Sequence, residues 1–277
     1  MIKSSTPNPP AWAGLTLDRP RVMAVLNVTP DSFSDGGAHT DPVAAGLAMA
    51  ADGADIIDVG GESTRPGAPP VSPDTEQARV LPVIEALAAA GLRVSVDTSN
   101  ASTMRAALAA GAAIINDVSG LTRDPNASAV VAESGCPVVL MHMRGTPATM
   151  NALATYSDVV HDVKSELAAR LHAALTAGIQ PAQIVLDPGI GFAKLAPHSL
   201  ALLRGLAAFQ DLGYPLLVGV SRKSFIGALS GEPVPARRLG GSLAAGLFAV
   251  ARGAAVLRVH DVRATVQALR IWQALSA

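Results

Sequence analysis

Short apolar runs recur along the chain, and polar residues follow each run. The eight runs are Val22–Leu26, Ile56–Val59, Val94–Val96, Ile114–Ile115, Val138–Met141, Ile184–Leu186, Leu216–Val220 and Val256–Val259. The residues after them include Asn27, Glu62, Asp97, Asn116, His142, Asp187, Ser221 and His260, and Arg258 lies within the last run. Continuous apolar runs are typical of parallel strands that are covered on both faces. Eight strands with polar residues at their carboxyl ends predict a (β/α)8 barrel whose reactive groups share one face.

Amphipathic helical patterns lie between the runs. Apolar residues recur at helical spacing over Val80–Leu87, and a longer pattern predicts a helix from about Ser157 to Ala177. Because Pro82 lies inside the first pattern, we expect a kink or a late helix start there. The runs begin roughly 20 to 45 residues apart, which leaves room for the helical crossovers that parallel strands require.

A doubly wound sheet is the alternative architecture. It would need a glycine-rich dinucleotide turn after an early strand, but the first run leads into a long polar loop, Asn27–Gly37. A P-loop is also missing from the sequence, because neither Lys194 nor Lys223 follows a glycine. The length of 277 residues matches one barrel, so we expect a single domain over residues 1–277. Residues 1–12 are expected to form a loose segment leading to a short strand near Gly14–Leu17.

The composition narrows the function classes. Hydrophobic residues make up 49% of the chain and aromatic residues only 3%, which predicts an aliphatic core. A formal net charge of −1 argues against bulk binding to nucleic acid or acidic membranes, so any anion site must be local. No uncharged apolar stretch reaches the roughly 18 to 20 residues of a membrane span. The single cysteine, Cys136, fits a reducing, cytoplasmic setting and is expected to be a small buried residue entering a strand.

Two long loops follow the first two runs. Thr29–Thr40 and Glu62–Ser72 are rich in Gly, Pro, Ser and Asp. Long loops in compact domains are often functional. Because both loops flank the predicted reactive face, we expect them to act as mobile lids rather than as variable surface loops.

Three polar residues at strand ends are expected to point into the same barrel opening: Asp97, Asn116 and Asp187. A single Asp at such a place could simply cap the next helix. Three groups on one face favour a ligand, because buried carboxylates need partners and a heterocycle with adjacent N–H donors would supply them. Asp187 also begins a glycine-containing loop in which Phe192 is available for stacking on a ligand.

Cationic residues gather where the last two runs end. Ser221–Ser224 lies at the start of a predicted helix, and Arg258 and His260 alternate at the end of the final strand. Loops at this place are the usual anion site of such barrels, and guanidinium groups bind phosphate oxygens well. Together with Arg65, this group predicts a diphosphate site.

The histidines do not predict a metal centre built by the protein. The six of them show no metalloenzyme spacing, and His161 and His172 are expected to face solvent on a helix. A Mg²⁺ ion carried by a diphosphate would need few protein ligands, and Asn27 is the candidate.

Several motifs resemble those of the dihydropteroate synthases. They are Leu26–Gly37, Asp58–Gly67, Val96–Thr98, Ile115–Asp117, Met141–Pro147, Asp187–Gly189, Ser221–Ser224 and Arg258–Val262, in the order found in that family. The similarity covers about residues 12–275. It implies an enzyme of folate biosynthesis that joins p-aminobenzoate to 6-hydroxymethyl-7,8-dihydropterin diphosphate, forming 7,8-dihydropteroate and pyrophosphate. It also implies a magnesium cofactor, sulfonamides as inhibitors, and a homodimer built on outer helices late in the chain.

The resemblance further implies a role for each candidate residue. The pterin is bound by Asp97, Asn116, Met141, Asp187, Gly219, Lys223 and Arg258; the diphosphate by Asn27, Arg65, Arg258 and His260, with Mg²⁺ near Asn27; and p-aminobenzoate by Thr64, Pro66, Phe192, Lys223 and Ser224. The catalytic residues would be Asn27, Asp97, Lys223 and Arg258. The expected reaction is SN1-like: diphosphate leaves, the pterin ring delocalises the cation beside anionic Asp97, and the aryl amine attacks without a general base.

Two positions depart from the usual pattern of the family. Ala193 stands where glycine is common, and we expect it to be accommodated with a negative φ. Arg144 stands where the family often has Gln, a loop change that we expect to matter little.

Other functions stay open as alternatives. A pterin-binding methyltransferase of similar fold would have no reason to carry the anion cluster of Arg65, Arg258 and His260. A non-catalytic pterin-binding paralogue would be expected to lose residues such as Asn27 or Lys223, and both are present. A phosphosugar-type barrel enzyme is a further alternative.

Overall fold

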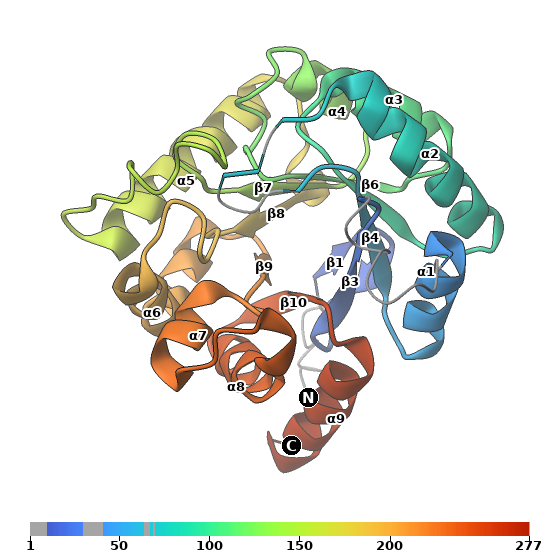
Figure 1. The fold of residues 1–277 in the computed structure, drawn as a ribbon. Helices are drawn as coiled ribbons and strands as arrows, with labels where there is room; N and C mark the ends of the chain where they lie inside the picture. The colour runs from blue at the N-terminus through green and yellow to red at the C-terminus, as the bar shows by residue number, and fades with distance from the viewer. Residues whose placement is uncertain (1–9, 30–40, 64–66, 69, 277) are drawn as a thin grey trace, which may run out of the picture.

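Eight parallel strands close into a barrel, with helices on its outside (Figure 1). The structure is a computed structural model that describes residues 10–29, 41–63, 67–68 and 70–276. The barrel strands, in the order β10-β3-β4-β5-β6-β7-β8-β9, are β3 (Arg21–Asn27), β4 (Ile56–Gly60), β5 (Val94–Asp97), β6 (Ile114–Asp117), β7 (Val138–Met141), β8 (Ile184–Asp187), β9 (Leu216–Val218) and β10 (Ala254–Val259). The predicted fold class is therefore confirmed, and each strand coincides with one of the predicted apolar runs.

The helices form a ring around the barrel (Figure 1). They are α1 (Pro42–Ala51), α2 (Pro73–Ala89), α3 (Ala101–Ala109), α4 (Ala127–Ser134), α5 (Val159–Thr176), α6 (Ala196–Arg204), α7 (Ser224–Ser230), α8 (Leu239–Val250) and α9 (Val262–Ser276). Short 3-10 turns occur at Pro181–Gln183, Leu206–Leu212 and Pro235–Arg237. The main core lies between the barrel and this ring, and it is almost entirely aliphatic, as the composition predicted.

Helix α2 begins earlier than the position of Pro82 suggested. The Ser72 hydroxyl accepts a hydrogen bond from the Thr75 amide at 3.3 Å, and Pro73 occupies the first turn, where no amide hydrogen is needed. These two residues supply a complete helix start, and the helix continues through Pro82. Of the two alternatives expected at Pro82, the late start is therefore wrong and the kink stays a prediction. One missing interior hydrogen bond is outweighed by the buried apolar face of the helix.

Helix α5 confirms the longer predicted pattern. The Asp158 carboxylate caps it by accepting hydrogen bonds from the amides of Val160 and His161 at 3.0 and 3.1 Å. Its apolar stripe faces the barrel, while His161 and His172 are exposed, as expected. Cys136 is buried just before β7, also as expected. Among the described residues, no helix combines the length and the apolar character needed to cross a membrane.

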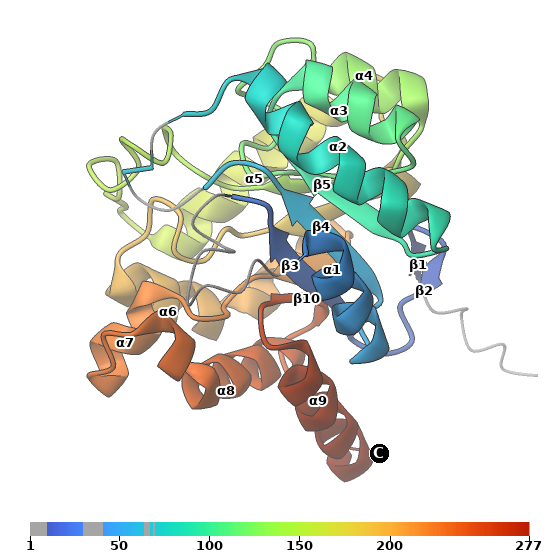
Figure 2. The same ribbon diagram turned by 45° about the vertical axis from the view of Figure 1, so that its right-hand side comes forward.

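A small hairpin covers the amino-terminal end of the barrel. Strands β1 (Ala11–Trp12) and β2 (Leu15–Thr16) pair antiparallel, and Trp12 is only 2% exposed. Its indole N–H donates to the Gln183 carbonyl at 2.8 Å. Figure 2 shows β1 and β2 on the opposite side of the view from α6 and α7. The short strand near Gly14–Leu17 is thus confirmed. The loose segment predicted over residues 1–12 is wrong for Ala11 and Trp12, which are held in this hairpin, and residues 1–9 lie outside the described residues.

The barrel interior has two layers. The lower layer is apolar and consists of Trp12, Met23, Ile56, Ile114, Val139, Val185, Leu217 and Val256. Side chains alternate along a strand, so the next inward position lies two residues further on. Those positions hold Val25, Asp58, Asn116, Met141, Asp187, Gly219 and Arg258, and in β5 Asp97 follows the buried Ser95 in the same way. The alternation therefore places a mostly polar layer directly above a mostly apolar floor.

Candidate active site

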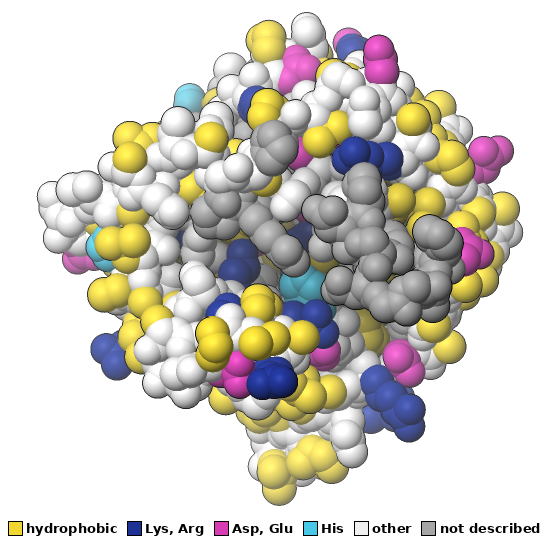
Figure 3. All heavy atoms as spheres, in the orientation of Figure 1, with side chains coloured by type: hydrophobic (Ala, Val, Ile, Leu, Met, Phe, Trp, Pro, Cys, Tyr) yellow, Lys and Arg dark blue, Asp and Glu magenta, His cyan; other side chains and the backbone are white. Residues whose placement is uncertain are grey.

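A pocket opens above the polar layer at the carboxyl ends of the strands. It is lined by Val25, Asn116, Val118, Met141, Asp187, Ile190, Phe192, Gly219, Ser221, Lys223, Arg258 and His260. Figure 3 shows basic side chains and a histidine at the bottom of a depression in this face. The structure thus brings together most of the predicted site residues that it describes.

An arginine bridges two carboxylates inside the pocket. Arg258 donates from Nε to Asp58 Oδ2 and from Nη2 to Asp97 Oδ2, each at 2.6 Å. Asn116 also donates to Asp58 Oδ2, at 2.9 Å. Burial alone would lower the pKa of Arg258, but the two carboxylates outweigh this effect and raise the pKa above its usual value. Burial raises the pKa of Asp97 to about 7, while Arg258 acts in the opposite direction.

Asp58 is a site residue that the sequence analysis missed. It lies in the middle of β4, is fully buried, and orients both Arg258 and Asn116. The analysis considered residues after each apolar run, and Asp58 lies inside one. Its signal was the alternation of Ile56, Asp58 and Gly60, which matches the inward positions of the other strands.

Asp187 and Asp117, which both belong to the motifs quoted above, differ in their hydrogen bonds. Asp117 accepts hydrogen bonds from the Ser99 hydroxyl and from two backbone amides, so its carboxylate fixes a turn outside the pocket. Asp187 accepts one, from the Gly189 amide at 2.7 Å. Burial raises the pKa of Asp187 to about 6, against the effects of the Gly189 amide and Lys223. Its second oxygen has no hydrogen bond within the described part of the chain and remains available to a ligand.

The loop after β8 packs tightly against β7 and against Lys223. A Cβ added to Gly189, whose φ is +67°, would lie 2.0 Å from the His142 carbonyl oxygen, so only glycine fits there. The Lys223 amine lies 4.0 Å from the centre of the Phe192 ring, a cation–π contact. Burial lowers the pKa of Lys223 to about 8, and Arg258 adds to this effect.

The backbone of Ala193 contradicts the prediction. Its φ is +50°, not negative. The methyl group is fully buried, and the Ala193 carbonyl accepts a hydrogen bond from the Tyr156 hydroxyl at 2.9 Å. The surrounding contacts hold this residue in a conformation that alanine by itself disfavours.

Arg144 takes part in a network beside the same loop. Its guanidinium forms a bidentate ion pair with Glu166 and lies 4.0 Å from the centre of the Tyr156 ring. The expectation that this change matters little stays a prediction.

The predicted anion side of the pocket contains His260 and Arg258, whereas Arg222 is already paired. His260 Nδ1 lies 3.1 Å from the Ser221 hydroxyl. Burial, reinforced by Arg222 and Arg258, lowers the pKa of His260 to about 3, so the imidazole is neutral at pH 7. Arg222 makes a bidentate ion pair with Asp261. A neutral histidine can donate a hydrogen bond to a phosphate oxygen without adding charge.

Asn27 ends β3 beside Gly60. A Cβ built on Gly60 would lie 3.6 Å from Asn27 Oδ1 and 3.8 Å from Asp97 Oδ2, so the two oxygens flank the same glycine. The described residues contain no cluster of three His, Cys, Asp or Glu side chains that could bind a metal. A cation here would need most of its ligands from a substrate.

Some predicted residues cannot be located. Thr64, Arg65 and Pro66 lie outside the described residues, as does most of Thr29–Thr40, so their roles and the lid hypothesis stay predictions. Ser224 is described: it is exposed at the start of α7, next to Lys223.

The described residues of the second long loop, Glu62–Ser72, make contacts with each other and with neighbouring loops. The Glu62 carboxylate lies 3.4 Å from the Val71 amide and 3.5 Å from Arg123 Nη1, and the Gly67 amide donates to the Pro147 carbonyl at 3.2 Å. These contacts link the two ends of the loop to each other and to the loop after β7.

Comparisons with known proteins agree on one family. The family model "Pterin binding enzyme" matches residues 23–260. A dihydropteroate synthase from Neisseria meningitidis serogroup B is 48% identical over 267 residues, covering 94% of both chains.

Solved structures of this type are similar over almost the whole chain. Xanthomonas albilineans dihydropteroate synthase with 4-aminobenzoic acid is 52% identical, with a TM-score of 0.90 and coverage of 96% of this chain and 97% of that one. The same enzyme with 7,8-dihydropteroate is 50% identical, with a TM-score of 0.87 and coverage of 95% of this chain and 96% of that one. The Yersinia pestis enzyme with a sulfonamide drug complex is 44% identical, with a TM-score of 0.90 and coverage of 95% of this chain and 97% of that one.

Proposed function

We propose that this chain, which belongs to the dihydropteroate synthases of the pterin-binding enzyme family, joins 6-hydroxymethyl-7,8-dihydropterin diphosphate to p-aminobenzoate. The observation that carries the proposal is the polar pocket above the apolar floor: it is lined by Asn116, Asp187, Lys223 and Arg258, and Arg258 pairs with Asp97. Relatives at about half identity have been solved with p-aminobenzoate and with dihydropteroate, which supports the same substrate and product here.

The pterin lies in the polar layer. The available oxygen of Asp187 accepts hydrogen bonds from adjacent N–H groups of the ring, while Asn116 and Lys223 supply donors to its acceptors. Met141 and Gly219 line the apolar parts of the slot, and Arg258 covers the ring face. Gly219 has no side chain and so leaves this part of the slot open.

The diphosphate lies towards His260, Arg258 and Asn27, with Arg65 as a further partner from the second loop. Mg²⁺ fits this arrangement, because it is commonly bound by one or two protein oxygens together with substrate phosphates. Asn27 Oδ1 is the protein oxygen that would hold it. Bound there, the ion would neutralise charge that develops on the leaving diphosphate.

The reaction proceeds by departure of the diphosphate before the amine attacks. The bond between the pterin methylene carbon and the diphosphate oxygen breaks, and its electron pair leaves with pyrophosphate. Anionic Asp97 stabilises the resulting pterin cation through space. The amine of p-aminobenzoate then forms the new C–N bond and loses one proton to solvent, so no general base is needed.

p-Aminobenzoate lies nearer the opening than the pterin. Phe192, Lys223 and Ser224 follow the ends of β8 and β9 and form one side of this pocket. Thr64 and Pro66 would complete it from the second loop. Sulfonamides compete for the same place, a proposal supported by the Yersinia pestis complex.

Formation of pyrophosphate tests the proposal. With both substrates and Mg²⁺, the purified protein should release one pyrophosphate for each dihydropteroate formed. Asp187→Asn should bind pterin at least about tenfold more weakly, because the amide presents a donor towards ring donors and leaves buried groups unpaired. Asp124→Asn is the matched control, since Asp124 caps the Ala101 and Asn126 amides away from the pocket. Pterin binding without pyrophosphate release would instead identify a non-catalytic paralogue.

A homodimer and a cytoplasmic location complete the proposal. Helices α6, α7 and α8 form an exposed apolar groove lined by Leu200, Leu203, Arg204, Phe225, Ile226, Leu229, Ser230, Gly241, Ala244, Ala245 and Phe248. Leu229 is 62% exposed, and contiguous exposed apolar surface favours association. A second copy covering this groove would place the dimer on late outer helices.

The lone buried Cys136 supports a reducing compartment, and so the proposed cytoplasmic location.

A further inference from the structure

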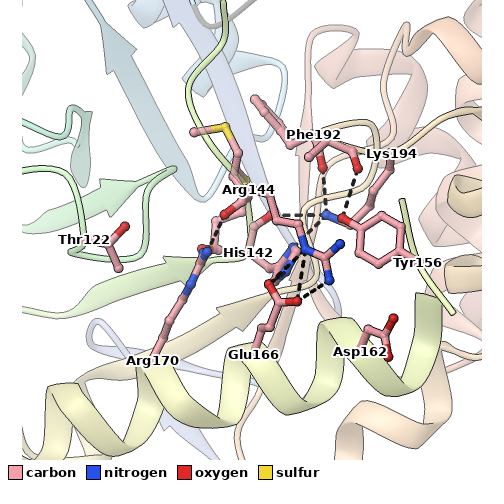
Figure 4. A network of polar contacts seen from close by, with 12 residues as sticks. Thr122, His142, Arg144, Tyr156, Asp162, Glu166, Arg170, Phe192 and Lys194 are labelled. Atoms are coloured by element: carbon pink, nitrogen blue, oxygen red, sulfur yellow. Dashed lines mark hydrogen bonds and ion pairs between the residues drawn. The ribbon is translucent and has the colours of Figure 1, made fainter. Parts of the chain in front are cut away.

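A buried lysine beside the pocket has no role in the chemistry proposed above. Lys194 is 5% exposed and does not line the pocket. Its amine lies 2.9 Å from His142 Nδ1, 3.3 Å from the His142 carbonyl oxygen and 2.8 Å from the Phe192 carbonyl oxygen. Burial lowers the pKa of Lys194 well below its usual range, and three protein acceptors surround the amine, so the side chain is fully engaged inside the protein (Figure 4).

His142 transmits this contact to helix α5. Because Lys194 donates to Nδ1, the imidazole carries its proton on Nε2, which lies 2.9 Å from Glu166 Oε2. Burial, together with the Lys194 charge, lowers the pKa of His142 to about 3, which agrees with a neutral ring. Glu166 is held in turn by Arg144. Figure 4 shows these side chains gathered between α5 and the loops after β7 and β8.

The network acts on three consecutive residues of the loop after β8. Lys194 holds the Phe192 carbonyl, Tyr156 holds the Ala193 carbonyl, and His142 holds Lys194 itself. Ala193 has a φ of +50°, a conformation that persists only where surrounding contacts impose it. These contacts therefore determine where the Phe192 ring lies relative to Lys223.

We propose that Lys194 is a positioning residue for the reaction: its hydrogen bonds to the Phe192 carbonyl and to His142 hold the Phe192 ring against Lys223 and so shape the p-aminobenzoate pocket. This inference rests on the proposed function, because it assigns Phe192 to that pocket. Asp187, by contrast, accepts its hydrogen bond from the Gly189 amide, a contact that Lys194→Met leaves in place.

The test is Lys194→Met, which keeps the length of the side chain and removes the amine. The KM for p-aminobenzoate should rise about tenfold, because the hydrogen bonds to the Phe192 carbonyl and to His142 are lost, while the affinity for a pterin ligand should change less than about twofold. Lys164→Met is the matched control: this lysine of α5 pairs with Asp211 on the surface and should leave both values unchanged.

Tyr156→Phe provides a second variant that keeps the ring beneath Arg144 and removes only the hydroxyl bound to Ala193. It should raise the KM for p-aminobenzoate about threefold, the effect of one neutral hydrogen bond. Equal losses for pterin and p-aminobenzoate would indicate a merely structural role and overturn the proposal. So would an unchanged KM in either variant, and Tyr156→Phe decides the matter if Lys194→Met does not fold.

Fluorine NMR separates this proposal from the proposed function. The chain has five phenylalanines, so 4-fluorophenylalanine labelling gives few signals, and Phe192→Leu identifies the relevant one. Lys194→Met should shift or broaden the Phe192 signal, whereas Lys164→Met should not. An unmoved signal would overturn the positioning role even in an active enzyme. Absence of turnover in the wild-type protein would overturn the proposed function alone.

Discussion

Two residues beside the pocket adopt backbone conformations that glycine normally provides. Ala193 has a φ of +50° and Arg222 a φ of +59°. Arg222 is held there by its ion pair with Asp261 and by its amide, which donates to the Ser242 hydroxyl at 2.9 Å. The turn lets both Ser221 and Lys223 line the pocket while Arg222 does not. Left-handed conformations in such residues are costly and tend to cluster at functional sites.

Substitutions of Ala193 should depend strongly on the shape of the new side chain. Ala193→Gly should change the free energy of unfolding by less than about 1 kcal/mol, because relief of the left-handed conformation offsets the loss of a buried methyl group. Ala193→Val should lower it by about 2 kcal/mol or more, because a β-branched side chain fits neither the backbone nor the packed site. Urea unfolding measures both, and a stable valine variant would contradict the positive φ.

Pterin binding should show a bell-shaped pH dependence. Below the pKa values of Asp97 and Asp187, about 7 and about 6, the carboxylates become protonated and lose acceptors; above about 8, Lys223 loses its charge. Calorimetric titration with a pterin that lacks phosphate avoids ionisation of the ligand's phosphates. Lys223→Arg should remove the alkaline decline, since arginine stays charged. An alkaline decline that persists in this variant would exclude Lys223 as its origin.

The site residues illustrate what a sequence pattern can reveal. Asp97, Asn116 and Asp187 were predicted because they end apolar runs, and parallel strands bring such ends together. Asp58 was missed because it lies inside a run, and the backbone of Ala193 was mispredicted because its conformation depends on Tyr156, 37 residues away. Contacts made through folding set the backbone of Ala193, and local pattern does not encode them, whereas the alternation of Ile56, Asp58 and Gly60 does mark Asp58 as an inward residue.

At the scale of elements, the strands were predicted more reliably than their surroundings. A continuous apolar run marks each barrel strand within the short stretch that forms it, so its position follows from local residues. The start of α2 was mispredicted because Pro82 was weighed without the Ser72 cap. The hairpin of β1 and β2 was only half predicted, because nothing in Ala11–Thr16 reveals that Trp12 reaches Gln183.

Removing Trp12 should destabilise the barrel from its amino-terminal end. Trp12→Ala should lower the free energy of unfolding by about 3 to 5 kcal/mol, since it deletes the largest side chain of the apolar floor. Trp12→Phe should cost less, about 1 to 3 kcal/mol, because it mainly leaves the Gln183 carbonyl without its indole donor. Urea unfolding followed by circular dichroism measures the change. Trp272→Ala on α9, which is only half-buried, is the control and should cost less than Trp12→Ala.

At the scale of the whole molecule, the apolar groove on α6, α7 and α8 predicts the site of association. Phe248→Glu should weaken the dimer by about thirtyfold or more, because a charge replaces an apolar side chain in the groove. Leu47→Glu on α1 is the matched control, an equally exposed apolar residue away from the groove. Sedimentation velocity measures both variants. A monomeric wild-type protein, or equal effects of the two substitutions, would place the interface elsewhere or remove it.

The order of substrate binding should reflect closure of the loops over the diphosphate. p-Aminobenzoate should bind at least about tenfold more tightly in the presence of pterin, Mg²⁺ and pyrophosphate than to the free enzyme. Arg65→Ala should abolish this enhancement and leave the affinity for pterin alone unchanged. Calorimetric titrations with and without pyrophosphate provide the measurement. Equal affinities in the wild-type protein would show that the pocket is formed in advance, against the lid hypothesis for Thr29–Thr40 and Glu62–Ser72.

The apolar floor, which includes Trp12, closes the amino-terminal end of the barrel. Ligands therefore reach the described pocket from the carboxyl ends of the strands, and this sets the order in which they enter and leave. Most groups assigned to the pterin lie on the strands, whereas Phe192 and Ser224 come after the strand ends, so we expect p-aminobenzoate to lie between the pterin and the opening. Whatever enters first must leave last. A bound pterin therefore cannot dissociate once p-aminobenzoate has bound. The product, which occupies both the pterin slot and the p-aminobenzoate pocket, must dissociate before another pterin can bind.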